Sequence, residues 1–244
     1  MGTNLFKAGV AEALGVFFLT FVGGSAICMN AFMKLSAAGG AEDTFGLLGI
    51  ALAHGLALMI GVYAFAAKSG AHINPAVTIG LFVIGKVKAN QMVTYVVMQL
   101  IGGAIGGLCV WAMFSMFKGN PPYLGHLSYD ADALSMPKAI GIEAMLTFVL
   151  MMTVLMVAVD AGRSARQMFG LCIGMAVTLG ILIGGPYTGA AMNPARYFGT
   201  AAVAGKVDQL AVYFIGPILG AIIAALVYKL FLEDKAPEAA AEAL

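Results

Sequence analysis

The sequence predicts an all-α membrane protein with six transmembrane helices and two half-helices, arranged as an inverted repeat. Of the 244 residues, 61% are hydrophobic and only 10% are charged, whereas a soluble domain carries about 25% charged residues. The tripeptide Asn-Pro-Ala occurs twice, at 74–76 and 193–195, each time in an apolar stretch too short to span a bilayer. A chain with so little charge lacks the polar surface that a water-soluble protein of this size needs.

Six segments are long enough to cross a membrane, because a spanning helix needs about 20 mostly apolar residues. We predict these helices at about 8–33, 47–67, 91–117, 138–159, 168–185 and 208–232. The first segment is longer than the hydrophobic region of a signal peptide and contains Glu12, so we interpret it as a spanning helix. Glycines four residues apart, such as Gly102/Gly106 and Gly216/Gly220, predict closely crossing helices.

Two further apolar stretches, at about 70–85 and 188–203, predict the half-helices. Asn is a good helix N-cap and Pro is favoured at the first helical position, so each tripeptide predicts a helix start. These are Asn74-Pro75-Ala76 and Asn193-Pro194-Ala195. A helix of about ten residues is ~15 Å long, which is half a bilayer. Irregular backbone at that depth is tolerated only where it is buried in protein or lines a water-filled cavity.

The chain is an internal duplication. Gly-Ala-His-Ile-Asn-Pro-Ala at 70–76 matches Gly-Ala-Ala-Met-Asn-Pro-Ala at 189–195, and Glu12 of the first helix has a counterpart in Glu143 of the fourth. Because each repeat contains three spanning helices, an odd number, the two halves must have opposite orientations. We predict one transmembrane domain over 1–232, with repeats at about 8–117 and 138–232, followed by an acidic, Ala-rich cytoplasmic tail over 233–244.

The distribution of the 13 Lys and Arg residues predicts that both termini are cytoplasmic. With the N-terminus inside, the inner face carries eight of them: Lys7, Lys68, Lys86, Lys88, Arg163, Arg166, Lys229 and Lys235. The outer face carries five: Lys34, Lys118, Lys138, Arg196 and Lys206. We therefore expect an integral multi-pass protein of the cell (inner or plasma) membrane.

Composition argues against several other classes of protein. Net charge is +1 and the basic residues are scattered, so we expect no nucleic-acid partner. The cysteines Cys28, Cys109 and Cys172 have no metal-ligand spacing, and no nucleophile–base pair or phosphate loop is present, so we expect neither an enzyme nor a metal or cofactor. Glu12 and Glu143 leave two interpretations open: a proton relay in a secondary transporter, or acceptors for backbone N–H groups ahead of each half-helix.

Ser69–Thr78 and Thr188–Arg196, with Arg three residues after the second Asn, resemble the paired signatures of the aquaporin (major intrinsic protein) family. The resemblance covers about residues 8–232 and implies a passive channel for water and small neutral solutes, built as a homotetramer with one pore in each protomer. It also implies that Glu12 and Glu143 are structural acceptors. The half-helix N-termini, each worth about +0.5 of a charge, would repel cations while the two Asn amides donate to passing water.

The resemblance also implies a selectivity filter at His54, Ile181, Ala190 and Arg196. His54 lies 20 residues before Asn74 and Ile181 lies 12 before Asn193. This set is similar to that of plant tonoplast aquaporins, many of which pass ammonia or urea besides water. His126, in the loop after the third span, is a candidate fifth member. The alternative for His54 is an interhelical hydrogen bond.

Two other functions remain open at this point. One is a glycerol or urea facilitator, although that type usually has Trp in the second span and Asp after the Arg. This chain has His54 and Tyr197 at those positions, and Tyr213-Phe214 precedes Ile215-Gly216-Pro217. The other is a proton-coupled secondary transporter, which would also use inverted repeats and intramembrane Glu.

Overall fold

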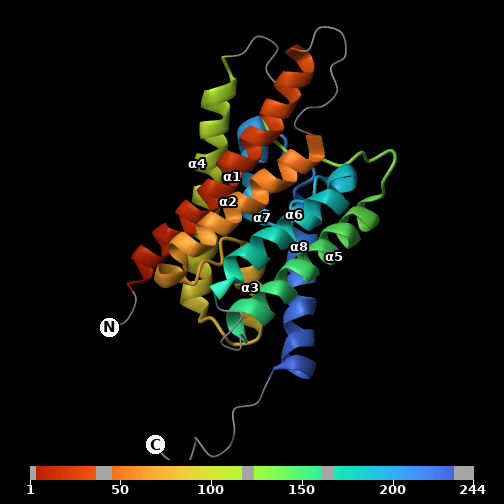
Figure 1. Cartoon of the computed structure of the whole chain (residues 1–244). Coiled ribbons are helices and arrows are strands. Elements are labelled where there is room, and N and C mark those ends of the chain that lie inside the picture. The colour runs from red at the N-terminus through yellow and green to blue at the C-terminus, as the bar shows by residue number, and fades with distance from the viewer. Residues whose placement is uncertain (1–3, 37–45, 117–123, 161–166, 234–244) are drawn as a thin grey trace, which may run out of the picture.

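The computed structural model describes residues 4–36, 46–116, 124–160 and 167–233, and every regular element in these ranges is helical. Figure 1 shows the helices packed side by side in one bundle. Within the described ranges, six helices are long and apolar enough to cross a membrane, as predicted. They are α1 (Leu5–Ser36), α2 (Gly46–Ser69), α4 (Ala89–Phe114), α5 (Met136–Val154), α6 (Phe169–Thr188) and α8 (Leu210–Val227). Single π-helical segments, Leu155–Val159 and Tyr228–Leu232, continue α5 and α8.

The two short helices are α3 (Pro75–Val83) and α7 (Pro194–Ala204). Each begins as the sequence predicts: the Asn74 side chain accepts a hydrogen bond from the N–H of Ala76, and the Asn193 side chain accepts from the N–H groups of Ala195 and Arg196. The apolar stretches themselves begin earlier, at about 70 and 188, and the residues before each Asn form an unwound loop. Alternate residues there have positive φ, Ala71 and Ile73 in one loop and Ala190 and Met192 in the other.

The helix boundaries lie within a few residues of the predicted ones, and one difference has a clear tertiary cause. The fifth predicted segment ended at 185, just before Pro186, whereas α6 continues to Thr188 with Pro186 inside it. Only Gly189, with φ 77°, ends the helix. The side chain of Thr188 bonds to Glu143 of α5, so tertiary contact holds the last turn that the proline by itself would weaken.

Glycines set the close approach of helices in both halves. A Cβ at Gly102 of α4 would overlap the carbonyl of Ala13 in α1, and a Cβ at Gly220 of α8 would overlap the carbonyl of Ala144 in α5. The α1–α4 pair is thus repeated by the α5–α8 pair, as an inverted repeat requires. Helices α2 and α6 join the two halves through Gly55 and Gly174, which meet in the same way.

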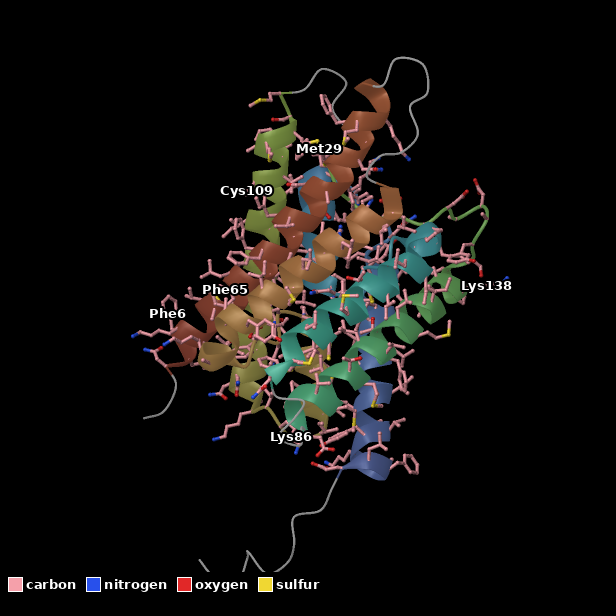
Figure 2. The ribbon with its side chains drawn as sticks, viewed as in Figure 1. Phe6, Met29, Phe65, Lys86, Cys109 and Lys138 are labelled. Atoms are coloured by element: carbon pink, nitrogen blue, oxygen red, sulfur yellow. The ribbon has the colours of Figure 1, made fainter. Side chains whose placement is uncertain are left out.

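The outer surface of the bundle is apolar. Figure 2 shows Phe6 at the outer edge of the bundle near the start of α1, and many large apolar side chains are exposed, among them Leu52, Ile105, Leu179, Ile183 and Leu219. Figure 2 also places Lys86 toward the lower end and Lys138 at the start of α5. Of the predicted tail, the structure describes Glu233, and Lys118, Arg163, Arg166 and Lys235 lie outside the described residues.

Candidate functional site

A cavity of about 240 Å³ extends through the bundle between the two repeats. The four predicted filter residues line it toward one end, Asn74 and Asn193 line its middle, and Lys86, Gln91 and Phe169 line the other end. Most of the remaining lining is apolar, for example Leu58, Val77, Val154, Ile173 and Val177. Polar side chains are few among the lining residues: His54, His72, Asn74, Lys86, Gln91, Asn193 and Arg196.

The two Asn side chains tie the half-helices together at the middle of the cavity. The Asn74 amide nitrogen donates to the carbonyl of Met192 over 2.8 Å, and the Asn193 amide nitrogen donates to the carbonyl of Ile73 over 2.8 Å. Each side-chain oxygen caps its own helix at the same time. Because an amide NH₂ group has two donors, one N–H of each Asn is left for a molecule in the cavity. Sequence reasoning missed this crossed pair of bonds.

The Glu12 carboxylate organises the loop before α3. It is fully buried and accepts hydrogen bonds from the N–H of His72 (2.9 Å) and of Ile73 (2.6 Å). The hydroxyl of Ser69 and the amide of Gln99 also donate to it, over 2.6 and 2.7 Å. Unwound backbone N–H groups that would cost ~1–3 kcal/mol each if unpaired are thereby satisfied.

The Glu143 carboxylate does the same for the loop before α7. It too is fully buried, and it accepts from the N–H groups of Ala191 (2.9 Å) and Met192 (2.8 Å) and from the hydroxyl of Thr188 (2.7 Å). Neither carboxylate lines the cavity. Both carboxylates therefore bind the loops on the side away from the cavity, where a molecule in the cavity does not contact them.

Arg196 and His54 are joined directly at the filter. The guanidinium, only 1% exposed, donates from Nη2 (2.9 Å) and Nε (3.3 Å) to Nε2 of His54. The other ring nitrogen, Nδ1, lies 2.8 Å from the carbonyl of Ile50, which can only accept. Nδ1 therefore carries the ring proton and Nε2 accepts, which is the neutral imidazole. The two side chains are therefore in direct contact and are not separated by the cavity that both line.

Ile181 of α6 and Ala190 of the second loop complete the predicted set. Both line the cavity and are 3% exposed. Neither has a polar side chain, so among these four residues only Arg196 and His54 have hydrogen-bonding side chains. The predicted filter thus combines two polar and two apolar side chains.

His126 lies beside this group but does not line the cavity. Its ring centroid is 5.7 Å from that of Tyr197, which in turn stacks on Tyr213 at 4.1 Å. The preceding residue makes the contact with the filter: the carbonyl of Gly125 accepts from Nη1 of Arg196 over 3.2 Å. No motif in the sequence indicated Gly125, because a backbone carbonyl in a loop has no residue signature.

The pKa of His126 predicts an acid-sensitive loop. Burial, and secondly the positive charge of Arg196, lowers this pKa from 6.5 to about 4, with Asp208 opposing and Lys206 adding to the shift. The unfolded chain then binds the proton more readily than the folded one. Stability that is present above pH 6.5 is therefore lost as the pH falls toward 4, by up to about 1.4 kcal/mol per pH unit.

We expect the melting temperature of the purified protein to fall less steeply between pH 7 and 5 in His126→Phe than in wild type. Equal slopes would contradict the assignment.

The other end of the cavity carries a charged pair. Nζ of Lys86 lies 2.7 Å from a carboxylate oxygen of Glu233, and this hydrogen bond is the main cause that raises the pKa of Lys86. In the described ranges no group of three His, Cys, Asp or Glu side chains could hold a metal ion.

Comparisons with known proteins agree on one family. The family model described as Major intrinsic protein matches residues 2–228. The chain is 39% identical over 223 residues to Aquaporin TIP4-4 of Zea mays, covering 91% of this chain and 85% of that protein. It is 36% identical over 221 residues to Aquaporin NIP1-1 of Zea mays, covering 91% and 73%. The X-ray structure of the aquaglyceroporin from Plasmodium falciparum superposes with a TM-score of 0.80 at 25% identity, covering 94% of this chain and 97% of that one.

Proposed function

The chain belongs to the major intrinsic protein family, and on that premise we propose that its cavity conducts water and also ammonia or urea, while excluding protons and ions. Membership of the family makes the protein an integral multi-pass membrane protein and a passive channel for water and small solutes, and it indicates a channel rather than an enzyme. The observation that carries the proposed solute range is the filter itself. Arg196 is hydrogen-bonded to His54, and the other two residues of the predicted filter, Ile181 and Ala190, line the cavity with apolar side chains.

Proton and cation exclusion follows from the middle of the cavity. The N-termini of α3 and α7 face it, each contributing about +0.5 of a charge. A water molecule between Asn74 and Asn193 would accept from both free amide protons, so its own hydrogens would point away along the channel. That orientation interrupts a hydrogen-bonded proton wire, and the positive helix ends repel cations.

The filter chemistry favours small neutral solutes. Nε, Nη1 and Nη2 of Arg196 all donate to protein acceptors. These bonds hold the charged guanidinium at the side of the cavity, so it does not extend into the cavity centre. Urea and ammonia carry polar groups that can bond to Arg196, while the apolar side chains of Ile181 and Ala190 make only van der Waals contact with the solute. The guanidinium charge still disfavours any cation there.

The alternative functions fit less well. In a glycerol facilitator the position after the arginine usually carries Asp, but here Tyr197 is buried and stacked on Tyr213. A proton-coupled transporter would need a carboxylate that solvent can reach. Glu12 and Glu143 are fully buried, lie outside the cavity lining and are occupied by backbone donors.

Exchange of two filter residues tests the proposed solute range. The double variant His54→Phe/Ile181→His places an aromatic ring in α2 and the imidazole in α6, which recreates a water-type constriction. We expect water permeability to persist and urea or ammonia permeability to fall by about tenfold or more. A pocket discriminates by about tenfold or more against a molecule that differs by a single methylene, and this exchange replaces two whole side chains. Stopped-flow light scattering on proteoliposomes, with separate sucrose, urea and ammonium gradients, measures all three.

Two outcomes of that experiment would contradict the proposal. A wild-type protein that already excludes urea and ammonia removes the argument for a permissive filter. A double variant with the wild-type solute profile shows that these positions do not set it. A steep temperature dependence of water flux would instead favour a transporter.

We further propose a homotetramer in the cell (inner or plasma) membrane with both termini cytoplasmic. The apolar outer faces of the bundle fit contact with lipid and with neighbouring protomers. In Figure 1 the start of α1 and the end of α8 lie toward the same end of the bundle, which fits a shared side for the termini. Crosslinking in native membranes and protease access to each terminus test these proposals.

A further inference from the structure

The imidazole of His54 lies directly against the backbone of α1 at Gly23. A Cβ built on Gly23 would be 2.7 Å from Cε1 of His54 and closer still to Nε2 and Cδ2. Carbon atoms in favourable contact are about 3.5–4.0 Å apart, so even a methyl group at this position overlaps the ring. The missing side chain of Gly23 is therefore the space that the imidazole occupies.

Gly23 itself does not line the cavity. Leu19, four residues earlier in α1, does. Residues four apart lie on the same face of a helix, so Gly23 faces the same side as Leu19, one turn further along. At that level the ring of His54 lies between α1 and the cavity.

The ring is held at both nitrogen atoms. Nδ1 bonds to the carbonyl of Ile50, and Nε2 accepts from two nitrogens of Arg196. A small rotation of the His54 ring would not relieve the overlap with a side chain at Gly23 and also keep both hydrogen bonds, because three ring atoms lie too close to the Cβ position. The imidazole must move away from α1, which is toward the cavity that it already lines.

We propose that Gly23 is a specificity-determining residue of this channel, although it lies behind the filter. Because Gly23 has no side chain, the His54 ring can lie against α1 and hold the Arg196 guanidinium by a hydrogen bond. The space beside Ile181 and Ala190 then remains open to urea or ammonia. A larger residue pushes the ring into that space and breaks the bonds from Nε and Nη2 of Arg196. This inference rests on the proposed solute range, and its test separates the two.

Gly23→Ala is the primary variant. Gly23 lies within the α1 helix and alanine is the better helix former, so the backbone offers no obstacle to the change. We expect urea permeability in proteoliposomes to fall by about tenfold while water permeability changes much less. Gly141→Ala is the matched control, because a Cβ at Gly141 of α5 meets nothing within 4 Å. It should keep the wild-type values.

A double-mutant cycle ties the effect to the imidazole. His54→Ala removes the ring, so adding Gly23→Ala in that background should change urea permeability no further. The same additional loss in both backgrounds would overturn the proposal. If Gly23→Ala fails to fold but the double variant with His54→Ala folds, the overlap is demonstrated directly. Failure of both to fold would assign Gly23 to helix packing and overturn the proposal.

A spectroscopic measurement keeps the test independent of solute range. The ¹⁵N resonance of the unprotonated Nε2 of His54 reports its hydrogen bonds to Arg196 in membranes. We expect Gly23→Ala to shift it and Gly141→Ala to leave it in place. If wild type excludes urea yet the resonance shifts, the solute range is wrong and the role of Gly23 stands. An unshifted resonance with an unchanged solute profile refutes the role of Gly23.

Discussion

Replacing Arg196 with Val is expected to open a cation leak through the cavity while water flux persists. The guanidinium is 1% exposed and lines the cavity. A cation passing 4 Å from it meets a repulsion of about 4 kcal/mol at an effective dielectric constant of about 20. Losing that repulsion should raise the cation conductance by more than about tenfold, because about 1.4 kcal/mol corresponds to a factor of ten. Voltage clamp of cells that express the variant measures the conductance, and swelling assays measure the water flux.

Lys86→Met is the matched control, because it removes a positive charge at another position in the same cavity. Lys86 also lines the cavity, but at the opposite end, where its side chain is 40% exposed and paired with Glu233. Water and the carboxylate already screen it, so we expect no comparable leak. An Arg196 variant without added conductance would assign cation exclusion to the N-termini of α3 and α7 alone. Equal leaks from both variants would contradict a filter at Arg196.

Replacing Glu143 with Ala is expected to abolish most of the folded protein rather than change its selectivity. The carboxylate accepts from the N–H groups of Ala191 and Met192 and from the hydroxyl of Thr188. Each buried donor left without an acceptor costs ~1–3 kcal/mol, and the sum is comparable to the 5–15 kcal/mol by which folded proteins are typically stable. The yield of monodisperse protein in detergent and its melting temperature measure the loss.

Glu143→Gln separates hydrogen bonding from charge. Its side-chain oxygen can accept from one of the backbone donors, so we expect a smaller loss of stability than in Glu143→Ala. Asp132→Ala, a change at an exposed loop carboxylate, should leave the melting temperature unchanged. A well-folded Glu143→Ala protein with altered proton coupling would favour the transporter instead.

Features that depend on neighbouring residues were predictable from the sequence. Six apolar stretches of sufficient length gave six spanning helices, and each Asn-Pro pair began a half-helix because capping and the fixed φ of proline act within one turn. The family signatures also placed His54, Ile181, Ala190 and Arg196 around one cavity. The end of α6 was predicted too early, since a bond from Thr188 to another helix outweighs the local effect of Pro186.

The contacts that shape the filter were decided by tertiary structure alone. Arg196 bonds to a histidine 142 residues away and to a loop carbonyl 71 residues away. The side chains of Asn74 and Asn193 bond to carbonyl groups that are 118 and 120 residues away in the sequence. Such bonds depend on how closely whole helices approach, and that approach is set by glycines such as Gly23 and Gly102 meeting atoms of other helices. The sequence by itself determined the six spanning helices and the starts of the two half-helices. The packing distance between helices decided how the filter residues are oriented, because a shift of an ångström makes or breaks a hydrogen bond.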